Sequence, residues 1–369
     1  MRFNERSFVV LVAGVLVAAA VAAIAVFALT GGGDADVEDD GPLAVPVPQG
    51  NAAAALEGGV DTVLLLSGTS IVRQTVEAPE QEVVRNVKTQ SVYAAPGSSW
   101  IAYVRSAAPE EDFEPRPELV LYDLETEAKT RRGAGIAPLW NGAGTYVAFL
   151  KPVEPRNCVG EECSGDVRIG VVEAATGEAV ELLDPGTYSI LGWAGRHILV
   201  SDFARPDVIT AVAADGETSE LDFPATQYWG ASPDGRWLIK TNAKKTEFVA
   251  FDDGRLGDER IPIELDDLEL LEGSWSHDSE EVAAAVASRK KETTVVTFSP
   301  DEPAPELVPD SGGAIGSVLW SADNESLLFG RLLNPNKSLI QAVWCPTRNS
   351  GDCRIVISWT EGIALLRAE

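Results

Sequence analysis

From about residue 60 onward, short apolar runs alternate with clusters of turn-forming residues. Trp100–Val104 and Leu119–Asp123 are two such runs, and the more polar Glu127–Arg131 follows them. Short runs bounded by Gly, Pro, Asp and Ser are typical of β-strands, whereas helices need longer stretches with a period of 3.6. We therefore expect this part of the chain to fold as all-β structure.

A short unit recurs along the same region, in which an aromatic or small residue precedes a tight turn and then an apolar strand. The clearest copies are Ala231–Gly235, Trp275–Asp278 and Trp320–Asp323, and looser copies begin at Ala94, Trp140, Trp193 and Trp359. Successive copies lie between 38 and 53 residues apart. This is the repeat length of a four-stranded blade, so the fold class is predicted to be a β-propeller.

The two ends of the repeat region complete each other. Three predicted strands precede Ala94 without an inner strand, and Ile363–Leu366 at the C-terminus has no outer strands after it. The three are Val63–Leu66, Ile71–Val76 and Val83–Val87. Pairing the last strand with the first would close a seventh blade and remove an exposed sheet edge. Residues 60–369 then divide into seven blades of about 44 residues, although the spacing also allows six or eight.

The three clearest turn motifs resemble those of TolB-type, WD-repeat-like propellers, and the resemblance covers roughly residues 60–369. It implies an envelope or secreted interaction module that binds partners across a propeller face or the channel mouth. A membrane segment stands where TolB has an α/β domain, so TolB's own partners do not carry over. The Trp and Asp residues of the motif are expected to be structural, packing between blades and fixing the turn.

The N-terminus contains an uncharged apolar run, Phe8–Leu29, of 22 residues. As a helix it would measure about 33 Å and span a hydrocarbon core of about 30 Å. Arg2 and Arg6 precede it and several carboxylates follow it, so the positive-inside rule predicts residues 1–7 in the cytoplasm. A cleaved signal peptide is the alternative, since Ala23–Ala25 resembles a cleavage site, but its apolar region would be shorter.

Residues 31–59 are rich in Gly, Asp and Pro and lack apolar periodicity, which predicts a flexible acidic linker. The alternating carboxylates Asp34, Asp36 and Glu38 suggest a calcium loop. Such a loop needs Gly at its sixth position and Glu at its twelfth, where this chain has Asp39 and Val45. We therefore interpret the carboxylates as solvated.

The net charge of −28 argues against nucleic acid or an anionic lipid surface as the main partner. A high net charge also serves solubility alone, so it identifies no ligand. We expect a monomer whose contact with the membrane is made by residues 8–29.

The four cysteines form two close pairs in the region predicted to be exported. An oxidising compartment favours disulfides, and the two local pairings fit best because each segment is turn-rich and can close a hairpin. The predicted pairs are Cys158 with Cys163 and Cys345 with Cys353. Zinc is the alternative, but it usually needs closer spacing and would require both pairs to meet from distant blades.

Motifs for catalysis are largely missing from the sequence. It contains no Gly-x-Ser-x-Gly elbow and no phosphate-binding loop, and its histidines are His197 and His277. Three consecutive residues such as Ser276–Asp278 cannot converge as a spatial triad. We predict no cofactor, metal or catalytic residue. The alternative function is a secreted or tethered hydrolase that uses carboxylates gathered at the propeller channel.

Lysines and arginines concentrate in the loops predicted to join the second and third strands of the later blades. These residues are Lys151, Arg156, Arg205, Lys244, Lys245, Arg289, Lys290, Lys291 and Lys337. The opposite turns are acidic, and Glu110–Asp112 break the pattern in the first full blade. Lys and Arg are common in exposed hairpins, which is the simpler explanation. The functional interpretation is a docking face for an acidic protein or an anionic glycan, centred on Lys244, Lys245, Arg289, Lys290 and Lys291.

The function predicted from these features is a membrane-tethered, extracytoplasmic propeller that acts as a binding scaffold in the cell envelope. A sensor is a weaker alternative, because a cytoplasmic head of seven residues leaves little room to signal.

Overall fold

The computed structural model of the chain describes residues 62–67, 70–75, 81–84, 92–96, 98–106, 117–154, 158–159, 162–163, 165–242, 245–321, 324–334, 339–347, 353–358 and 363–366. In these residues the architecture is all-β, with one short 3₁₀ helix, η2 (Ala225–Gln227). The predicted all-β class is therefore confirmed. The predicted anchor, residues 8–29, and the predicted linker, residues 31–59, lie outside the described residues. Among the described ones, no helix is long and apolar enough to cross a membrane.

Within the described ranges, the strands pair into seven four-stranded antiparallel sheets and one two-stranded hairpin. The first three sheets along the chain are β4 (Val92–Ala94), β5 (Trp100–Ser106), β6 (Pro117–Asp123) and β7 (Lys129–Ala134); β8 (Ile136–Trp140), β9 (Tyr146–Pro152), β12 (Val167–Glu173) and β13 (Ala179–Glu181); and β14 (Tyr188–Ala194), β15 (His197–Asp202), β16 (Ile209–Ala213) and β17 (Thr218–Leu221). The next three are β18 (Tyr228–Ala231), β19 (Trp237–Asn242), β20 (Lys245–Asp252) and β21 (Arg255–Ile263); β22 (Glu269–Trp275), β23 (Val282–Ala287), β24 (Thr293–Phe298) and β25 (Glu306–Leu307); and β26 (Ala314–Trp320), β27 (Ser326–Asn334), β28 (Leu339–Pro346) and β29 (Arg354–Ser358).

The remaining sheet joins the two ends of the chain. It contains β1 (Thr62–Ser67), β2 (Ser70–Thr75), β3 (Gln81–Val84) and β30 (Ile363–Leu366), with β30 as its first strand. The C-terminal strand runs antiparallel to β1, in a register that pairs Thr62 with Leu366 and Leu65 with Ile363. This pairing covers the edge of β1 that would otherwise be open to other chains.

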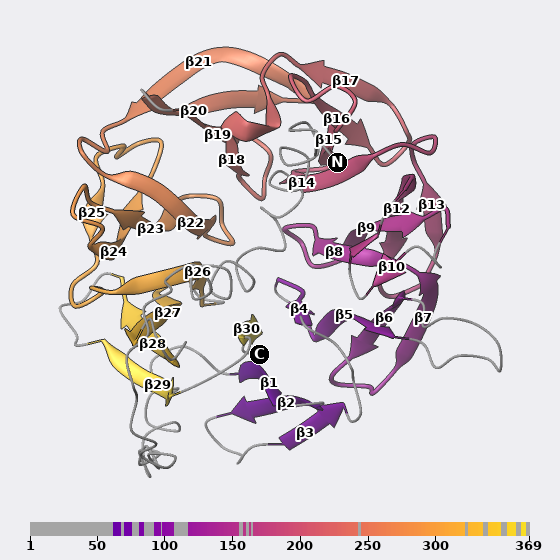
Figure 1. Cartoon of the computed structure of the whole chain (residues 1–369), viewed down its shortest axis with the longest axis horizontal. Coiled ribbons are helices and arrows are strands. Elements are labelled where there is room, and N and C mark those ends of the chain that lie inside the picture. Colours follow the sequence, from indigo (N-terminus) through magenta and orange to yellow (C-terminus); the bar gives the residue numbers. More distant parts are fainter. Residues whose placement is uncertain are drawn as a thin grey trace, which may run out of the picture.

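The sheets are arranged in a ring (Figure 1). The first strand of each sheet lies at the centre and the last strand at the periphery. We call the first strands, β30, β4, β8, β14, β18, β22 and β26, the inner strands. Antiparallel connection puts the turn after each inner strand at one end of the ring, which we call the turn face. The loops between second and third strands lie at the other end, which we call the loop face.

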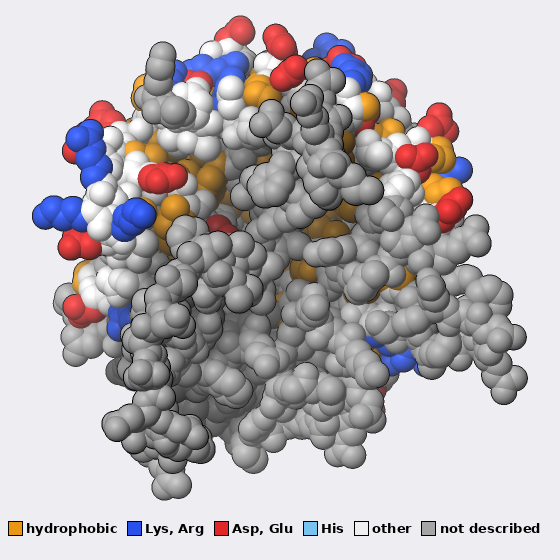
Figure 2. All heavy atoms as spheres, in the orientation of Figure 1, with side chains coloured by type: hydrophobic (Ala, Val, Ile, Leu, Met, Phe, Trp, Pro, Cys, Tyr) orange, Lys and Arg blue, Asp and Glu red, His pale blue; other side chains and the backbone are white. Residues whose placement is uncertain are grey.

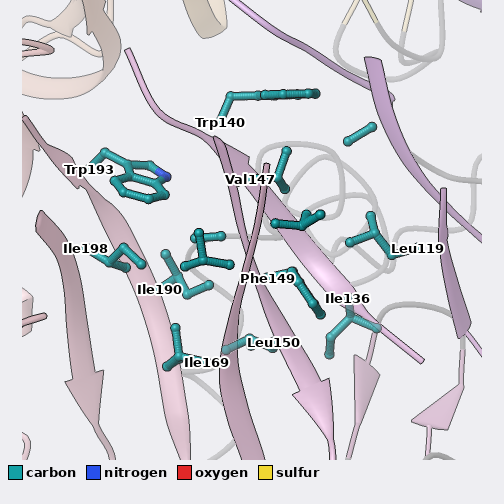
Figure 3. Packing of buried hydrophobic residues seen from close by; sticks show 14 of the residues in the cluster. Leu119, Ile136, Trp140, Val147, Phe149, Leu150, Ile169, Ile190, Trp193 and Ile198 are labelled. Atoms are coloured by element: carbon teal, nitrogen blue, oxygen red, sulfur yellow. The ribbon is translucent and has the colours of Figure 1, made fainter. Parts of the chain in front are cut away.

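The hydrophobic core lies between neighbouring sheets. One cluster of buried residues runs from β5 to β16 and includes Trp140, Phe149, Ile169, Ile190 and Trp193 (Figure 3). The middle strands are buried on both sides because each sheet is covered by two neighbours, so their sequences are continuously apolar rather than alternating. Strand β23 shows this, since Val282–Val286 is fully buried.

Candidate functional site

The repeated turn is fixed by its own serine and aspartate. Ser232 Oγ donates to Asp234 Oδ1 over 2.6 Å, and it accepts the backbone N–H of Trp237 over 2.9 Å. Ser276 repeats both contacts, with Asp278 over 2.6 Å and with the N–H of Glu281 over 2.9 Å. These hydrogen bonds hold the tight turns before β19 and β23. The motif residues therefore make the structural contacts expected of them.

Electrostatics in this turn favour the ionised carboxylate. Partial burial alone would raise the pKa of Asp234, but hydrogen bonds from Ser232 and Arg236 outweigh it and lower the pKa below its ordinary value. Ser276, His277 and Asp278 do not form a triad, because the serine hydroxyl bonds directly to the aspartate. The backbone N–H of His277 donates to Asn324 Oδ1 of the next sheet over 2.8 Å.

Tryptophans of the inner strands connect neighbouring sheets. Trp140 Nε1 donates to the carbonyl of Tyr93 over 2.9 Å, and Trp193 Nε1 donates to that of Leu139 over 2.9 Å. Trp320 Nε1 donates to the carbonyl of Ser274 over 3.0 Å. In each case the acceptor lies one residue before the position where the repeated unit begins in the preceding sheet, which is Ala94, Trp140 or Trp275. We call Trp140, Trp193 and Trp320 the tryptophan ladder.

The ladder is interrupted at β18, where the repeated unit begins with Ala231 instead of Trp. Tyr228 fills part of the space, because its hydroxyl lies 2.3 Å from where a Cβ on Gly192 would stand. On the next sheet Trp275 is 6% exposed, yet its Nε1 has no hydrogen-bond partner among the described residues. In the opposite direction, Trp229 Nε1 donates to the carbonyl of Leu271 over 2.7 Å.

Five of the seven inner strands, β8, β14, β18, β22 and β26, also carry a β-bulge. The register shifts between Ile136 and Leu139, between Ile190 and Gly192, between Tyr228 and Gly230, between Leu270 and Gly273, and between Ile315 and Val318. Bulges redirect side chains and are frequent beside binding sites. Trp229 and Leu271 are bulge residues, and Leu271 is 36% exposed. The bulges were not predicted from the sequence, where the interruption of the ladder is visible only as Ala in place of Trp at position 231.

Those of the predicted basic residues that the structure describes lie on the loop face or next to it, but several are paired with carboxylates. Lys151 contacts Glu181 over 2.5 Å and Arg205 contacts Glu220 over 2.7 Å. Lys245 pairs with Glu247, and Arg289 pairs with Asp267. Lys244, Arg156 and Lys337 lie outside the described residues.

Lys290 and Lys291 differ from these cations. Both are exposed on the loop between β23 and β24, and neither forms an ion pair within the described ranges. They adjoin Arg289, so of the five candidate docking residues these three form one contiguous group in sequence.

Carboxylates do not gather from several of the described inner strands. The acidic residues on the described inner strands are Glu269 and Glu272, and both belong to β22. In the described part of the chain no group of three or more His, Cys, Asp or Glu could hold a metal ion. His197 is buried against Phe251, and burial together with Arg196 lowers its pKa despite nearby Asp253.

One predicted disulfide is present. Cys345 and Cys353 are bonded across the loop that joins β28 and β29, with their Cα atoms 4.4 Å apart. The hairpin of β10 (Cys158–Val159) and β11 (Glu162–Cys163) places Cys158 opposite Cys163 in register. The side chains of that second pair lie outside the described part of the chain, so their bond stays a prediction.

The fold matches solved β-propellers. The tricorn protease is 11% identical, over 82% of this chain and 34% of that chain, with a TM-score of 0.50. The β-propeller domain of the Trilobed protease from Pyrococcus furiosus is 14% identical, over 73% of this chain and 84% of that chain, also with a TM-score of 0.50. TolB from Acinetobacter baumannii is 13% identical, over 79% and 64%, with a TM-score of 0.43.

The chain spans about a third of the tricorn protease chain. No protein-family model and no curated protein matches the sequence. The resemblance to TolB-like propellers is therefore confirmed as a resemblance of fold. At these identities the fold is what the solved structures share with this chain, and an activity does not follow from it.

Proposed function

We propose that this chain is a binding module of the cell envelope. Residues 8–29 anchor it in the membrane, residues 31–59 form an acidic tether, and residues 60–369 form a monomeric seven-bladed propeller outside the membrane. The apolar run and its flanking charges support the anchor. The seven four-stranded sheets and the pairing of β30 with β1 support the blade count.

The difference between the two faces carries the proposal of binding. On the turn face, the serines and aspartates of the repeated motif bond within the turn or to the neighbouring sheet. On the loop face, Lys290 and Lys291 are exposed without an ion pair in the described residues. Charged side chains that the fold itself does not use are available to a partner, and opposite charge speeds diffusional encounter.

The partner that fits this loop is an acidic protein of the envelope. Arg289 contributes to the same surface, although its ion pair with Asp267 offsets part of its positive charge. Lys245 is paired with Glu247 and is expected to contribute less than the 290–291 pair. Lys244 belongs to the predicted surface because it directly precedes Lys245 in the sequence, and the proposal therefore includes it.

The test compares three forms of the full chain: wild type, the double variant Lys290→Glu with Lys291→Glu, and a matched control. The control is Arg255→Glu with Arg260→Glu, which makes the same charge change on outer strand β21. Cross-linking in intact cells should capture an acidic protein with the wild type and the control. The lysine variant should associate about tenfold more slowly with the captured protein, with a weaker salt dependence.

Equal capture and equal association rates for all three forms would contradict the docking loop. Binding that persists after the captured proteins are digested would point to an anionic glycan instead. All three forms should have similar melting temperatures, since exposed substitutions usually change stability by about 0.5 kcal/mol or less.

A further inference from the structure

The contact between inner strands β18 and β22 differs from the contacts between the other inner strands. We define the β18–β22 seam as Trp229, Gly230, Glu269, Leu271 and Trp275. None of the four residues of β18 is buried, whereas β8 and β14 bury their ladder tryptophans. A Cβ added to Gly230 would meet only the indole of Trp275, at 3.8 Å from Nε1. A Cβ at position 230 would therefore be in ordinary van der Waals contact with Trp275, whose buried N–H has no hydrogen-bond partner among the described residues.

The loop-face end of the seam presents a rigid apolar surface. The hydrogen bond from Trp229 Nε1 to the carbonyl of Leu271 fixes the indole across the gap between the sheets. One part of this indole packs on the buried cluster around Trp275 and Phe248, while the side chain as a whole stays half-buried. Leu271 beside it is 36% exposed. A partly exposed aromatic ring held by its polar atom is a common anchor for a binding partner.

Two exposed carboxylates precede Leu271 in the chain, and the loop with Arg289, Lys290 and Lys291 lies at the same end of the sheet, since Glu269 is in register with Ala287. Glu269 opens β22 and Asp266 lies in the connection before it, and both are exposed. Neither carboxylate forms an ion pair with a cation that the structure describes. Asp267, between them in sequence, is neutralised by Arg289. In Figure 2, hydrophobic side chains gather on the inner side of the ring over β18 and β22, whereas many charged side chains lie toward its outer edge.

We propose that the β18–β22 seam binds an extended peptide segment in which an apolar side chain stands next to lysine or arginine. The apolar side chain packs on Trp229 and Leu271, and the cation meets Glu269 and Asp266. This goes beyond the proposed docking of an acidic protein, because the site lies at the centre of the ring and prefers the opposite charge. The full chain thus has two surfaces that respond to different substitutions.

Four fluorescein-labelled peptides test the proposal on the full chain in detergent. They share Gly-Ser flanks and carry the cores Lys-Phe-Lys, Lys-Ser-Lys, Glu-Phe-Glu and Glu-Ser-Glu. By fluorescence anisotropy, Lys-Phe-Lys should bind at least about tenfold more tightly than any of the other three. The Lys-Ser-Lys peptide measures the general attraction of a chain with net charge −28 for any cation.

Two substitutions locate the site. Leu271→Ser should weaken Lys-Phe-Lys binding about tenfold and leave Lys-Ser-Lys unchanged. Glu269→Lys should invert the preference, so that Glu-Phe-Glu becomes the tighter of the two Phe peptides. The matched controls Leu307→Ser and Glu306→Lys lie on outer strand β25 of the same sheet, where Leu307 is 65% exposed, and should change neither affinity.

Equal affinity for the Lys-Phe-Lys and Lys-Ser-Lys peptides would overturn the proposal, as would equal losses at Leu271 and Leu307. The lysine variant at positions 290 and 291 should bind Lys-Phe-Lys at least as tightly as the wild type. A loss of peptide binding in that variant would likewise contradict a separate central site. The failure of the acidic partner to bind would leave these peptide results standing.

Discussion

At the residue scale, the repeated Trp has a role that its apolar character alone does not explain. Trp140, Trp193 and Trp320 each donate an indole N–H to the backbone of the preceding sheet. Because these side chains are buried, the carbonyl acceptors would lose a partner if the indole were removed. Each ladder Trp therefore fixes both the spacing and the relative height of two sheets.

The interrupted ladder gives a matched pair of substitutions. Trp193→Phe removes a hydrogen bond to Leu139, whereas Trp275→Phe removes an N–H that has no partner in the described residues. Both changes delete similar apolar area, so their difference isolates the hydrogen bond. Trp193→Phe should lower the free energy of unfolding by about 1 kcal/mol more than Trp275→Phe, measured by urea denaturation. Equal losses would show that the ladder bonds add nothing to packing.

At the scale of elements, the ring depends on one strand supplied by the far end of the chain. Strand β30 pairs with β1 over four residue pairs and completes its sheet. The other described four-stranded sheets are each formed from one continuous segment, apart from the β10–β11 insertion. The contact between β1 and β30 therefore brings the two ends of the fold together. It joins strands with the greatest separation in the sequence, so it has the highest entropic cost of loop closure.

Truncation before Ile363 tests this contact. Removing residues 361–369 should cost on the order of 3 kcal/mol of stability, because the paired backbone of β1 loses its partner. It should also promote aggregation through the exposed edge. Removing only residues 367–369 is the control and should leave the thermal unfolding transition unchanged. A full-length melting temperature in the longer truncation, measured by circular dichroism, would contradict the role of β30 in closing the ring.

The sequence predicts the strands well and the inner wall poorly. Trp100–Val104 and Leu119–Asp123 are strands in the structure, as β5 and β6, because short apolar runs between turns leave little choice of secondary structure. The bulges at Trp229 and Leu271 could not be predicted, since they depend on how neighbouring sheets pack. The ion pair of Arg289 with Asp267 was missed for the same reason, because it joins two different loops.

At the scale of the whole molecule, the two proposals assign two chemically distinct surfaces to an acidic chain of net charge −28. We propose that the loop with Lys290 and Lys291 binds an acidic partner and speeds its encounter by opposite charge. At the β18–β22 seam, the proposed peptide site combines the apolar side chains of Trp229 and Leu271 with the carboxylates of Glu269 and Asp266. In the proposed arrangement the linker of residues 31–59 lets both surfaces move relative to the membrane.

The position of the propeller outside the membrane is the central claim, and protease treatment of intact cells tests it most directly. With an epitope tag at the N-terminus, protease added to the outside should cut within residues 31–59 and release a resistant fragment that contains residues 60–369. The tag should remain protected and membrane-bound, since residues 1–7 are expected in the cytoplasm. A soluble mature chain that begins between Ala25 and Asp36, or a propeller that is protected until the cells are lysed, would contradict the account.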